Sequence, residues 1–211
     1  MTTCFVRHGR TPYSARHLVN GDPGIPVLLD EEGAQEARRS RSLLRELGLR
    51  ACRTSSFPRT RQTADLLLEE SSCSRSVDAC LDEPDYGKFE GRPFLEYASW
   101  LKTHGPTVRP PGSCESQHEA LLRVVAGCAR LPSVASPRLV VAHGFLLSAL
   151  TWCRSRQPQA EFPLFLPEAP YLEPLVVTDR CLLEWVELLR GEVRSACSSN
   201  EGRGAPPISS E

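Results

Sequence analysis

Several features are scarce or absent in this 211-residue chain, and each absence excludes a class of protein. No run approaches the ~18 uncharged apolar residues that a membrane-spanning helix needs. The first residues, MTTCFVRHG, lack the basic start and the apolar core of a secretory signal peptide. The net charge of −1 leaves no excess of positive charge for general nucleic-acid binding. We therefore expect a cytoplasmic protein whose partners include neither a membrane nor a nucleic acid.

Paired cysteines and lysines are also lacking. The nine cysteines form no Cys-x-x-Cys pair, and the spacing of His and Cys shows no metal-ligand set, so we expect no metal ion and no cofactor. Cys4, Cys52, Cys128 and Cys181 lie in apolar stretches, which predicts reduced packing residues. Only two of the 25 basic residues are lysines, and arginine is the better bidentate partner for phosphate.

Short β-rich runs alternate with helical patterns along the chain. This order predicts an α/β fold, a three-layer sandwich in which helices cover both faces of a mostly parallel central sheet. Strands are expected at residues 3–6, 49–54, 76–80, 138–142 and 175–178. Helices are expected after Asp30, Pro58 and His143, around 121–128, and at 180–190.

Two segments depart from this alternation. Residues 86–113 are rich in Pro and Gly, and we expect them to leave the sheet as an irregular loop that contacts the substrate. From residue 193 the composition turns polar and rich in turn formers, which predicts a disordered tail at 193–211. The chain therefore reads as one catalytic domain, 1–192, followed by a tail.

Two of the expected strands end in the same way, TCFVRHG at 3–9 and RLVVAHG at 138–144. Each places a histidine and then a glycine at the carboxyl end of a parallel strand, the edge where open α/β sheets bind ligands. His8 and His143 are therefore expected to face one crevice. Gly9 and Gly144 are expected to leave room there for a ligand to approach the backbone.

Arginine side chains add positive charge to this edge. Arg7 directly precedes the first histidine, and Arg59 and Arg61 follow Pro58 at the start of a helix. Because these two arginines are two positions apart, only one of them is expected to reach the crevice. Two guanidinium groups, two imidazoles and free backbone N–H groups together predict a site for a phosphate group.

A carboxylate run, LDEPDYGKFEG at 81–91, follows another expected strand. One of Asp82, Glu83 and Asp85 could donate a proton to a leaving oxygen. We interpret Glu90 as an exposed loop residue.

Together these residues resemble the histidine phosphatase superfamily, with its phosphoglycerate mutase-like fold, over about residues 3–180. Arg7-His8-Gly9 with Thr11 is similar to the family's N-terminal motif, and the resemblance implies that His8 becomes phosphorylated. Ser55 and Thr63 align with a further motif that makes Arg59 the phosphate-binding arginine. The resemblance also implies that Glu83 is the general acid and His143 the second pocket histidine.

The same resemblance extends to substrate contacts and helix starts. Asn20 and Gly21 lie where the family contacts its substrate, and residues 29–33 match a helix start with Asp30 in place of Thr. Glu115-Ser116 resembles another helix start, with Cys114 where Gly is usual. Ser14 replaces an Asn that touches the phosphoryl group. The implied substrate-binding residues are Arg7, Gly9, Ser14, Asn20, Gly21, Arg59, His143 and Gly144.

The expected function is metal-independent hydrolysis of a small phosphomonoester through phosphohistidine on His8, with Glu83 as general acid and base. A phosphoglycerate-type mutase is the first alternative, but mutases of this fold carry a longer insertion than the 60 positions that separate Glu83 from His143. A non-catalytic module that binds a phospho-ligand is the second, and the presence of both His8 and Glu83 speaks against it. The physiological substrate and the oligomeric state stay open.

Overall fold

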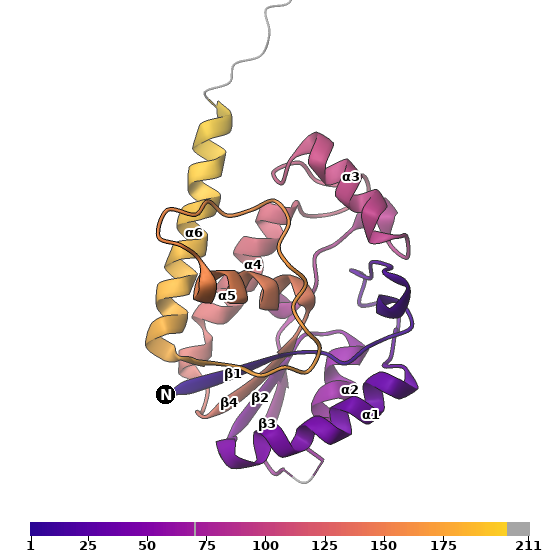
Figure 1. Ribbon diagram of the computed structural model, residues 1–211, viewed down its shortest axis with the longest axis vertical. Helices are drawn as coiled ribbons and strands as arrows, with labels where there is room; N and C mark the ends of the chain where they lie inside the picture. Colours follow the sequence, from indigo (N-terminus) through magenta and orange to yellow (C-terminus); the bar gives the residue numbers. More distant parts are fainter. Residues whose placement is uncertain (70, 202–211) are drawn as a thin grey trace, which may run out of the picture.

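A five-stranded sheet lies at the centre of the computed structural model, which describes residues 1–69 and 71–201 (Figure 1). Its strands are β1 (Thr2–Arg7), β2 (Ala51–Thr54), β3 (Ser74–Val77), β4 (Arg138–Ala142) and β5 (Leu175–Thr178), in the order β3-β2-β4-β1-β5. All neighbouring pairs are parallel except β5, which runs antiparallel to β1. The predicted, mostly parallel sheet is confirmed.

Side chains that alternate along the strands supply two separate cores. In β1, Cys4 and Val6 pack against α1 (Glu31–Ser40) and α2 (Pro58–Leu67) on one face of the sheet. Phe5 points to the opposite face, which is covered by α4 (Gln117–Ala129), α5 (Gly144–Ser155) and α6 (Asp179–Glu201). The predicted three-layer architecture is therefore confirmed.

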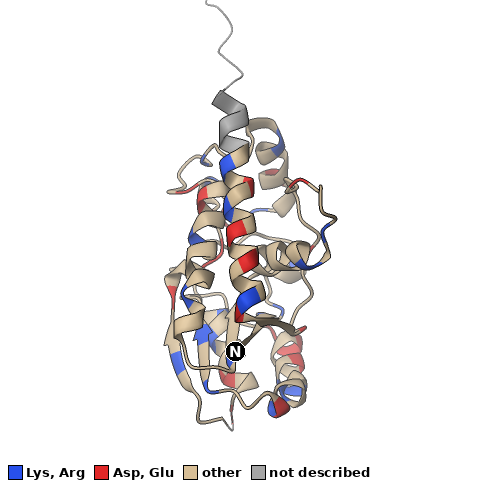
Figure 2. Ribbon diagram, turned by 90° about the vertical axis from the view of Figure 1, so that its left-hand side faces the viewer, with Lys and Arg blue, Asp and Glu red and all other residues tan. Residues whose placement is uncertain are grey.

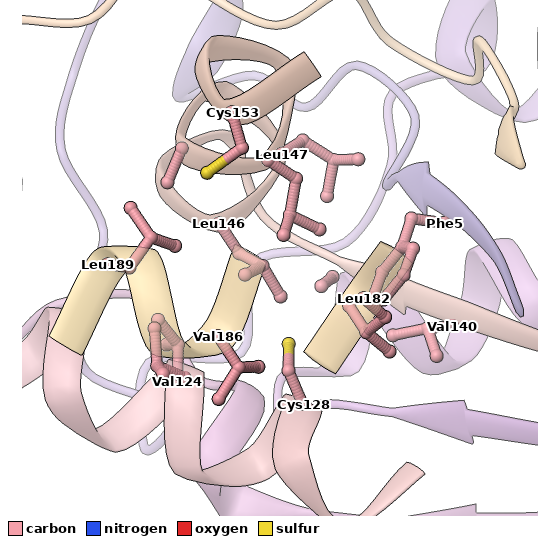
Figure 3. Close-up of a cluster of buried hydrophobic side chains, with 14 of the residues drawn as sticks. Phe5, Val124, Cys128, Val140, Leu146, Leu147, Cys153, Leu182, Val186 and Leu189 are labelled. Carbon is pink, nitrogen blue, oxygen red and sulfur yellow. The ribbon is translucent and has the colours of Figure 1, made fainter. Parts of the chain in front are cut away.

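The larger core lies where α4, α5 and α6 meet the sheet (Figure 3). Val124 of α4, Leu146 of α5 and Leu189 of α6 point toward one another there, and each is almost completely buried. Burial of such a side chain contributes about 1.5–3 kcal/mol to stability. Cys128 packs into the same core as a free thiol, as predicted, and Cys4 and Cys52 are buried and free in the other one. Cys181 is free and half-buried.

Helix α6 extends beyond its expected end at residue 190. The helix continues to Glu201, and Val193 is buried in the core beneath it. Charged residues, including the Arg180–Glu184 ion pair, follow the outward face of α6 (Figure 2). Apolar residues on one stripe of a helix stabilise it despite a polar local composition, and the helix includes residues 193–201 of the expected tail. Residues 202–211 of the expected tail lie outside the described residues.

The segment 86–113 leaves the sheet as expected, but it is not irregular throughout. Helix α3 (Phe94–His104) lies apart from the sheet (Figure 1). It buries Tyr97 and Leu101 in a small cluster with Val19, Tyr86 and Phe89. The spacing of Tyr97 and Leu101 by four positions places both on one face of the helix, which is the pattern that the Pro and Gly content obscured.

Helix starts and turns explain the remaining boundaries. Asp30 caps α1 by accepting a hydrogen bond from Gly33 N at 2.7 Å. Strand β3 ends at Val77 because the Asp78 side chain accepts from Cys80 N at 3.0 Å and begins a short 3₁₀ turn, so the expected strand at 76–80 is placed too late. Among the described residues, no helix is both long and apolar enough to cross a membrane.

Candidate active site

The carboxyl ends of β1, β4 and β2 lie side by side and deliver three polar residues to one edge of the sheet. Arg7 pairs with Ala142, and Thr54 pairs with Val141, so His8 and His143 follow at the same level and Ser55 lies one residue before it. The His8 and His143 rings are 5.2 Å apart between centroids. The structure thus brings together the two histidines that the strand ends placed at one edge.

His8 is held as a neutral imidazole. Its Nδ1 donates a hydrogen bond to Gly9 O at 2.8 Å, so the lone pair is on Nε2, which accepts from Arg59 Nε at 3.1 Å. Burial, reinforced by the charges of Arg59 and Arg7, holds the pKa of His8 well below its usual value. A neutral imidazole with a directed lone pair is the form that a nucleophilic histidine needs.

Arg59 forms hydrogen bonds with three other residues of the site. It lies in the first turn of α2 and is 4% exposed, whereas Arg61 is exposed, so Arg59 alone of the two points inward. Besides His8, its guanidinium donates to Asn20 Oδ1, to Asn20 O at 3.0 Å and to His143 Nδ1 at 3.1 Å. Burial lowers the pKa of Arg59 to about 10, which still leaves it charged at neutral pH.

His143 is buried and is not part of the cavity wall described below. Its Nε2 lies 2.7 Å from Ser55 Oγ, which lies 2.8 Å from Thr60 Oγ1. Burial and the charge of Arg59 hold the pKa of His143 well below its usual value. A neutral His143 therefore accepts from Arg59 through Nδ1 and donates to Ser55 through Nε2, which fixes the direction of the guanidinium.

Arg7 is oriented by residues from the connection between α5 and β5. Its NH1 donates to Glu168 at 2.7 Å and to Ala169 O at 2.5 Å. Its NH2 donates to Tyr171 Oη at 2.9 Å, and its guanidinium stacks 3.8 Å from the centre of that ring. The buried Nε of Arg7 has no hydrogen-bond partner within the described residues. No local motif marked these three partners, because they lie more than 160 positions from Arg7.

Of the three candidate carboxylates, only Glu83 lines the cavity. Its Oε1 accepts from Tyr86 Oη at 3.2 Å, and its Oε2 is buried. Burial raises the pKa of Glu83, although the charges of Arg59 and Arg7 oppose that shift. Asp82 instead accepts from Ser56 N at 2.7 Å.

Asp85 also has a structural role, because it accepts from Gly87 N at 2.8 Å and from Cys114 N at 2.7 Å. Arg123 of α4 anchors the same loop. It is bound by Glu115 at 2.7 and 2.9 Å and donates to Asp82 O at 2.9 Å. Arg123 thus holds the segment that contains Glu83 in place through contacts outside the cavity.

Glu90, interpreted from the sequence as a loop residue, holds the turn that positions Arg59. Its Oε1 accepts from Asn20 Nδ2 at 2.8 Å, and its Oε2 accepts from Gly21 N at 2.7 Å and from Asp22 N at 3.2 Å. The interpretation as an exposed turn is therefore wrong. Sequence reasoning missed this role because Glu90 and Asn20 are 70 positions apart.

The glycines make room for the protein rather than for a ligand. A Cβ on Gly9 would lie 2.9 Å from Gly33 O, and one on Gly21 would lie 2.0 Å from Pro84 O. One on Gly144 would lie 3.3 Å from Arg7 Cζ. Of these three glycines, only Gly144 lines the cavity. The space beside Gly9, which was expected to admit a ligand, is filled by the backbone at Gly33.

Ser14 lines the cavity, but its hydroxyl is used within its own turn. Ser14 Oγ accepts from Thr11 N at 2.9 Å and donates to Thr11 O at 3.1 Å. The single hydroxyl proton is therefore already committed, and the structure gives Ser14 no free donor for a phosphoryl oxygen.

A cavity of about 930 Å³ opens above these residues. Arg7, His8, Asn20, Arg59 and Glu83 line its polar end. This end offers a nucleophile in His8, cationic donors in Arg7 and Arg59, and a carboxyl group in Glu83. These are the groups that transfer of a phosphoryl group requires. In the part of the chain that the structure describes, no group of three or more His, Cys, Asp or Glu side chains is arranged to hold a metal ion.

Comparisons with known proteins agree with this geometry. The chain is 33% identical over 154 residues to the probable phosphoglycerate mutase GpmB of Klebsiella pneumoniae, a match that covers 69% of this chain and 70% of that protein. The fold is similar to that of Bacillus stearothermophilus YhfR, with a TM-score of 0.69 and 21% identity over 84% of this chain and 90% of the other.

The α-ribazole phosphatase of Shigella flexneri has the same fold, with a TM-score of 0.63 and 23% identity, covering 72% of this chain and 79% of that one. The model of the histidine phosphatase superfamily, branch 1, matches residues 3–171. This match covers most of the chain and includes both strands that end at the paired histidines. The chain therefore belongs to the histidine phosphatase superfamily.

Proposed function

We propose that this protein hydrolyses phosphomonoesters through a covalent phosphohistidine on His8. The observation that carries the proposal is the pairing, in one cavity wall, of a neutral His8 imidazole with the buried Glu83 carboxyl group. A buried carboxyl group with a raised pKa is suited to donate a proton to a leaving oxygen.

In the first step, the bound substrate displaces the Arg59 N–H from the lone pair of His8 Nε2. The freed lone pair then attacks phosphorus. The bond from phosphorus to the alcohol oxygen breaks, and Glu83 gives its proton to that oxygen. In the second step, Glu83 takes a proton from water, which attacks phosphorus and returns the electron pair of the N–P bond to His8. Arg7 and Arg59 stabilise the equatorial oxygens, and such a donor typically contributes about 10²- to 10³-fold in rate.

A phosphoglycerate-type mutase is the second candidate, and the 33% identity to a probable mutase favours it. A mutase would retain the phosphoryl group on His8 and return it to a hydroxyl of a phosphoglycerate, which also carries a carboxylate. Beyond Arg7, His8 and Arg59, the basic side chains that line the cavity are Arg16 and His17 alone. Both belong to residues 13–19, and none of the lining residues from α3 or from 162–166 is basic, which supports hydrolysis over transfer between polyanions.

The test follows turnover and covalent labelling together. Wild-type protein should release phosphate from phenyl phosphate and carry an acid-labile phosphoryl label from ³²P-labelled substrate. His8→Ala should lose both activities, and the control His104→Ala, at an exposed position on α3, should keep both. A label that persists in His8→Ala would contradict the proposed nucleophile. Binding of phosphate by wild-type protein without turnover would leave only a binding module, and quantitative transfer of the label to a phosphoglycerate would identify a mutase.

A further inference from the structure

The cavity extends far beyond the space that a phosphate group needs. Ligand pockets for drug-sized molecules occupy roughly 300–1,000 Å³, and this one has about 930 Å³. The polar groups described above occupy one end of it. The remaining volume must be filled by the alcohol part of any phosphomonoester that uses the whole site.

The walls of that remaining volume are formed by three segments far apart in the sequence. They are residues 13–19, helix α3, and residues 162–166 of the connection between α5 and β5. Leu164 packs against the α3 cluster that also includes Val19, so the three segments form one continuous surface.

The side chains on this surface are large, apolar and accessible. Phe94 is 42% exposed, Leu95 is 77% exposed and Phe165 is 40% exposed, and all three line the cavity. Exposed apolar side chains that are gathered at one place mark a binding site, because their burial by a ligand is favourable. Because these side chains line the same cavity as His8 and Arg59, the ligand that covers them is inferred to be the substrate itself.

The charge distribution supports the same occupant. Arg7 and Arg59 lie at the phosphate end, whereas the outer wall offers Arg16 and His17 as its basic side chains. The acidic group nearest to Arg7 in that wall, Glu168, is already paired with it at 2.7 Å. Both of the basic side chains in the outer wall belong to residues 13–19, and the lining residues of α3 and of 162–166 include none. A second anionic group packed against α3 and residues 162–166 would therefore lie without a partner, which is costly.

We propose that the preferred substrates are phosphomonoesters of alcohols with a large, uncharged apolar group, which packs against α3 and residues 162–166. This inference rests on the proposed hydrolase function. An alkyl chain and an aromatic ring share the required chemistry, and the test below separates them.

The alkyl test compares ethyl phosphate, hexyl phosphate and 6-phosphonooxyhexanoate, whose leaving groups are similarly basic. Each buried methylene is worth about fourfold in kcat/KM, so hexyl phosphate should exceed ethyl phosphate by on the order of tenfold or more even with partial burial. The terminal carboxylate should abolish that gain. Phenyl and 1-naphthyl phosphate form the aromatic pair, and the larger of the two gains identifies the kind of apolar group.

A variant pair ties the gain to this surface. Leu95→Asp places a charge among the apolar walls, in the first turn of α3 where an acid is compatible with the helix. It should reduce the hexyl-to-ethyl ratio severalfold. Leu183→Asp, at a 42% exposed position on α6 outside the cavity, should leave that ratio unchanged.

The outcomes separate this inference from the proposed function. Turnover of all three alkyl phosphates with equal kcat/KM, or faster turnover of the carboxylated chain, would overturn the inference and leave the hydrolase intact. Absence of turnover would overturn the hydrolase. In that event, calorimetric binding of hexylphosphonate and ethylphosphonate decides the inference: tighter binding of the hexyl compound supports it, and equal binding refutes it.

Discussion

Burial of two ionisable side chains in one cavity gives the site its proposed acid and nucleophile. Burial disfavours charge, so it moves the pKa of Glu83 up and the pKa of His8 down. Arg59 and Arg7 act in the same direction as burial on His8 but oppose it on Glu83. The result is a neutral imidazole beside a carboxyl group that retains its proton to higher pH than an exposed glutamate does, an arrangement suited to acid–nucleophile pairing.

These shifts predict the pH dependence of turnover. Glu83 must be protonated to donate, so kcat falls as pH rises through its raised pKa, and His8 must be neutral, so activity falls as pH drops through its lowered pKa. Glu83→Gln should lower kcat for hexyl phosphate by about 10²- to 10⁴-fold and remove the upper limb of the profile. The loss should be smaller for 4-nitrophenyl phosphate, whose leaving group needs no proton.

Glu187→Gln, at an exposed position on α6, is the matched control and should retain the full profile. An upper limb that survives in Glu83→Gln would assign the proton donor to another group.

Single elements are held in place by contacts with distant parts of the chain. The turn at residues 20–22 presents Asn20 to Arg59, and this turn is itself held by the Glu90 carboxylate through three N–H donors. Glu90 does not itself line the cavity but hydrogen-bonds Asn20, which does, so Glu90 acts as a positioning residue. The Arg123 guanidinium holds the Glu83 segment in a similar way.

Glu90→Gln should therefore weaken substrate binding without changing the proton donor. A hydrogen bond to a charged group contributes about 1.5–3 kcal/mol, so kcat/KM should fall on the order of tenfold or more, mainly through a higher KM. Steady-state kinetics across pH checks this, because both limbs of the profile should keep their positions. Glu96→Gln, which disrupts the exposed ion pair between Arg92, just before α3, and Glu96 in its first turn, is the control and should change KM little.

An unchanged KM in Glu90→Gln would show that the turn keeps its position without the carboxylate. A displaced upper limb would instead mean that Glu90 contributes to the acid chemistry.

At the scale of the whole molecule, α6 lies beside α4 and α5, and its first turns lie near the sheet (Figure 1). Val186, Leu189 and Val193 form its inward stripe and pack with α4 and α5. The charged outer face contributes little to stability because exposed ion pairs are weak. The apolar stripe therefore contributes most of the stability that α6 adds to the fold.

Val193→Ala tests that contribution. Removal of buried methyl groups should lower the free energy of unfolding by about 1–3 kcal/mol, measured by urea denaturation. Val176→Ala, at a 53% exposed position on β5, is the matched control and should have a smaller effect. Equal effects of the two substitutions would place residue 193 outside the packed core.

Local patterns in the sequence determined the elements and the ends of the strands. The apolar runs that stop at His8 and His143, the cap at Asp30 and the start at Pro58 depend on neighbours within a few positions, and all of them appear in the structure. The parallel order of such elements then brings both histidines to one edge, because the carboxyl ends of parallel strands coincide.

Only the tertiary structure decided which polar groups act together. It placed Glu83, which the family resemblance had already indicated, in the cavity wall and left Asp82 and Asp85 outside it. It also brought Glu90 and Tyr171 to Asn20 and Arg7 and formed the apolar wall from α3 and residues 162–166. These choices depend on contacts between residues far apart in the chain, and on burial, which shifts the pKa values of His8 and Glu83 in opposite directions. Neither quantity is a property of a local stretch of sequence, whereas the strands that end at His8 and His143 are.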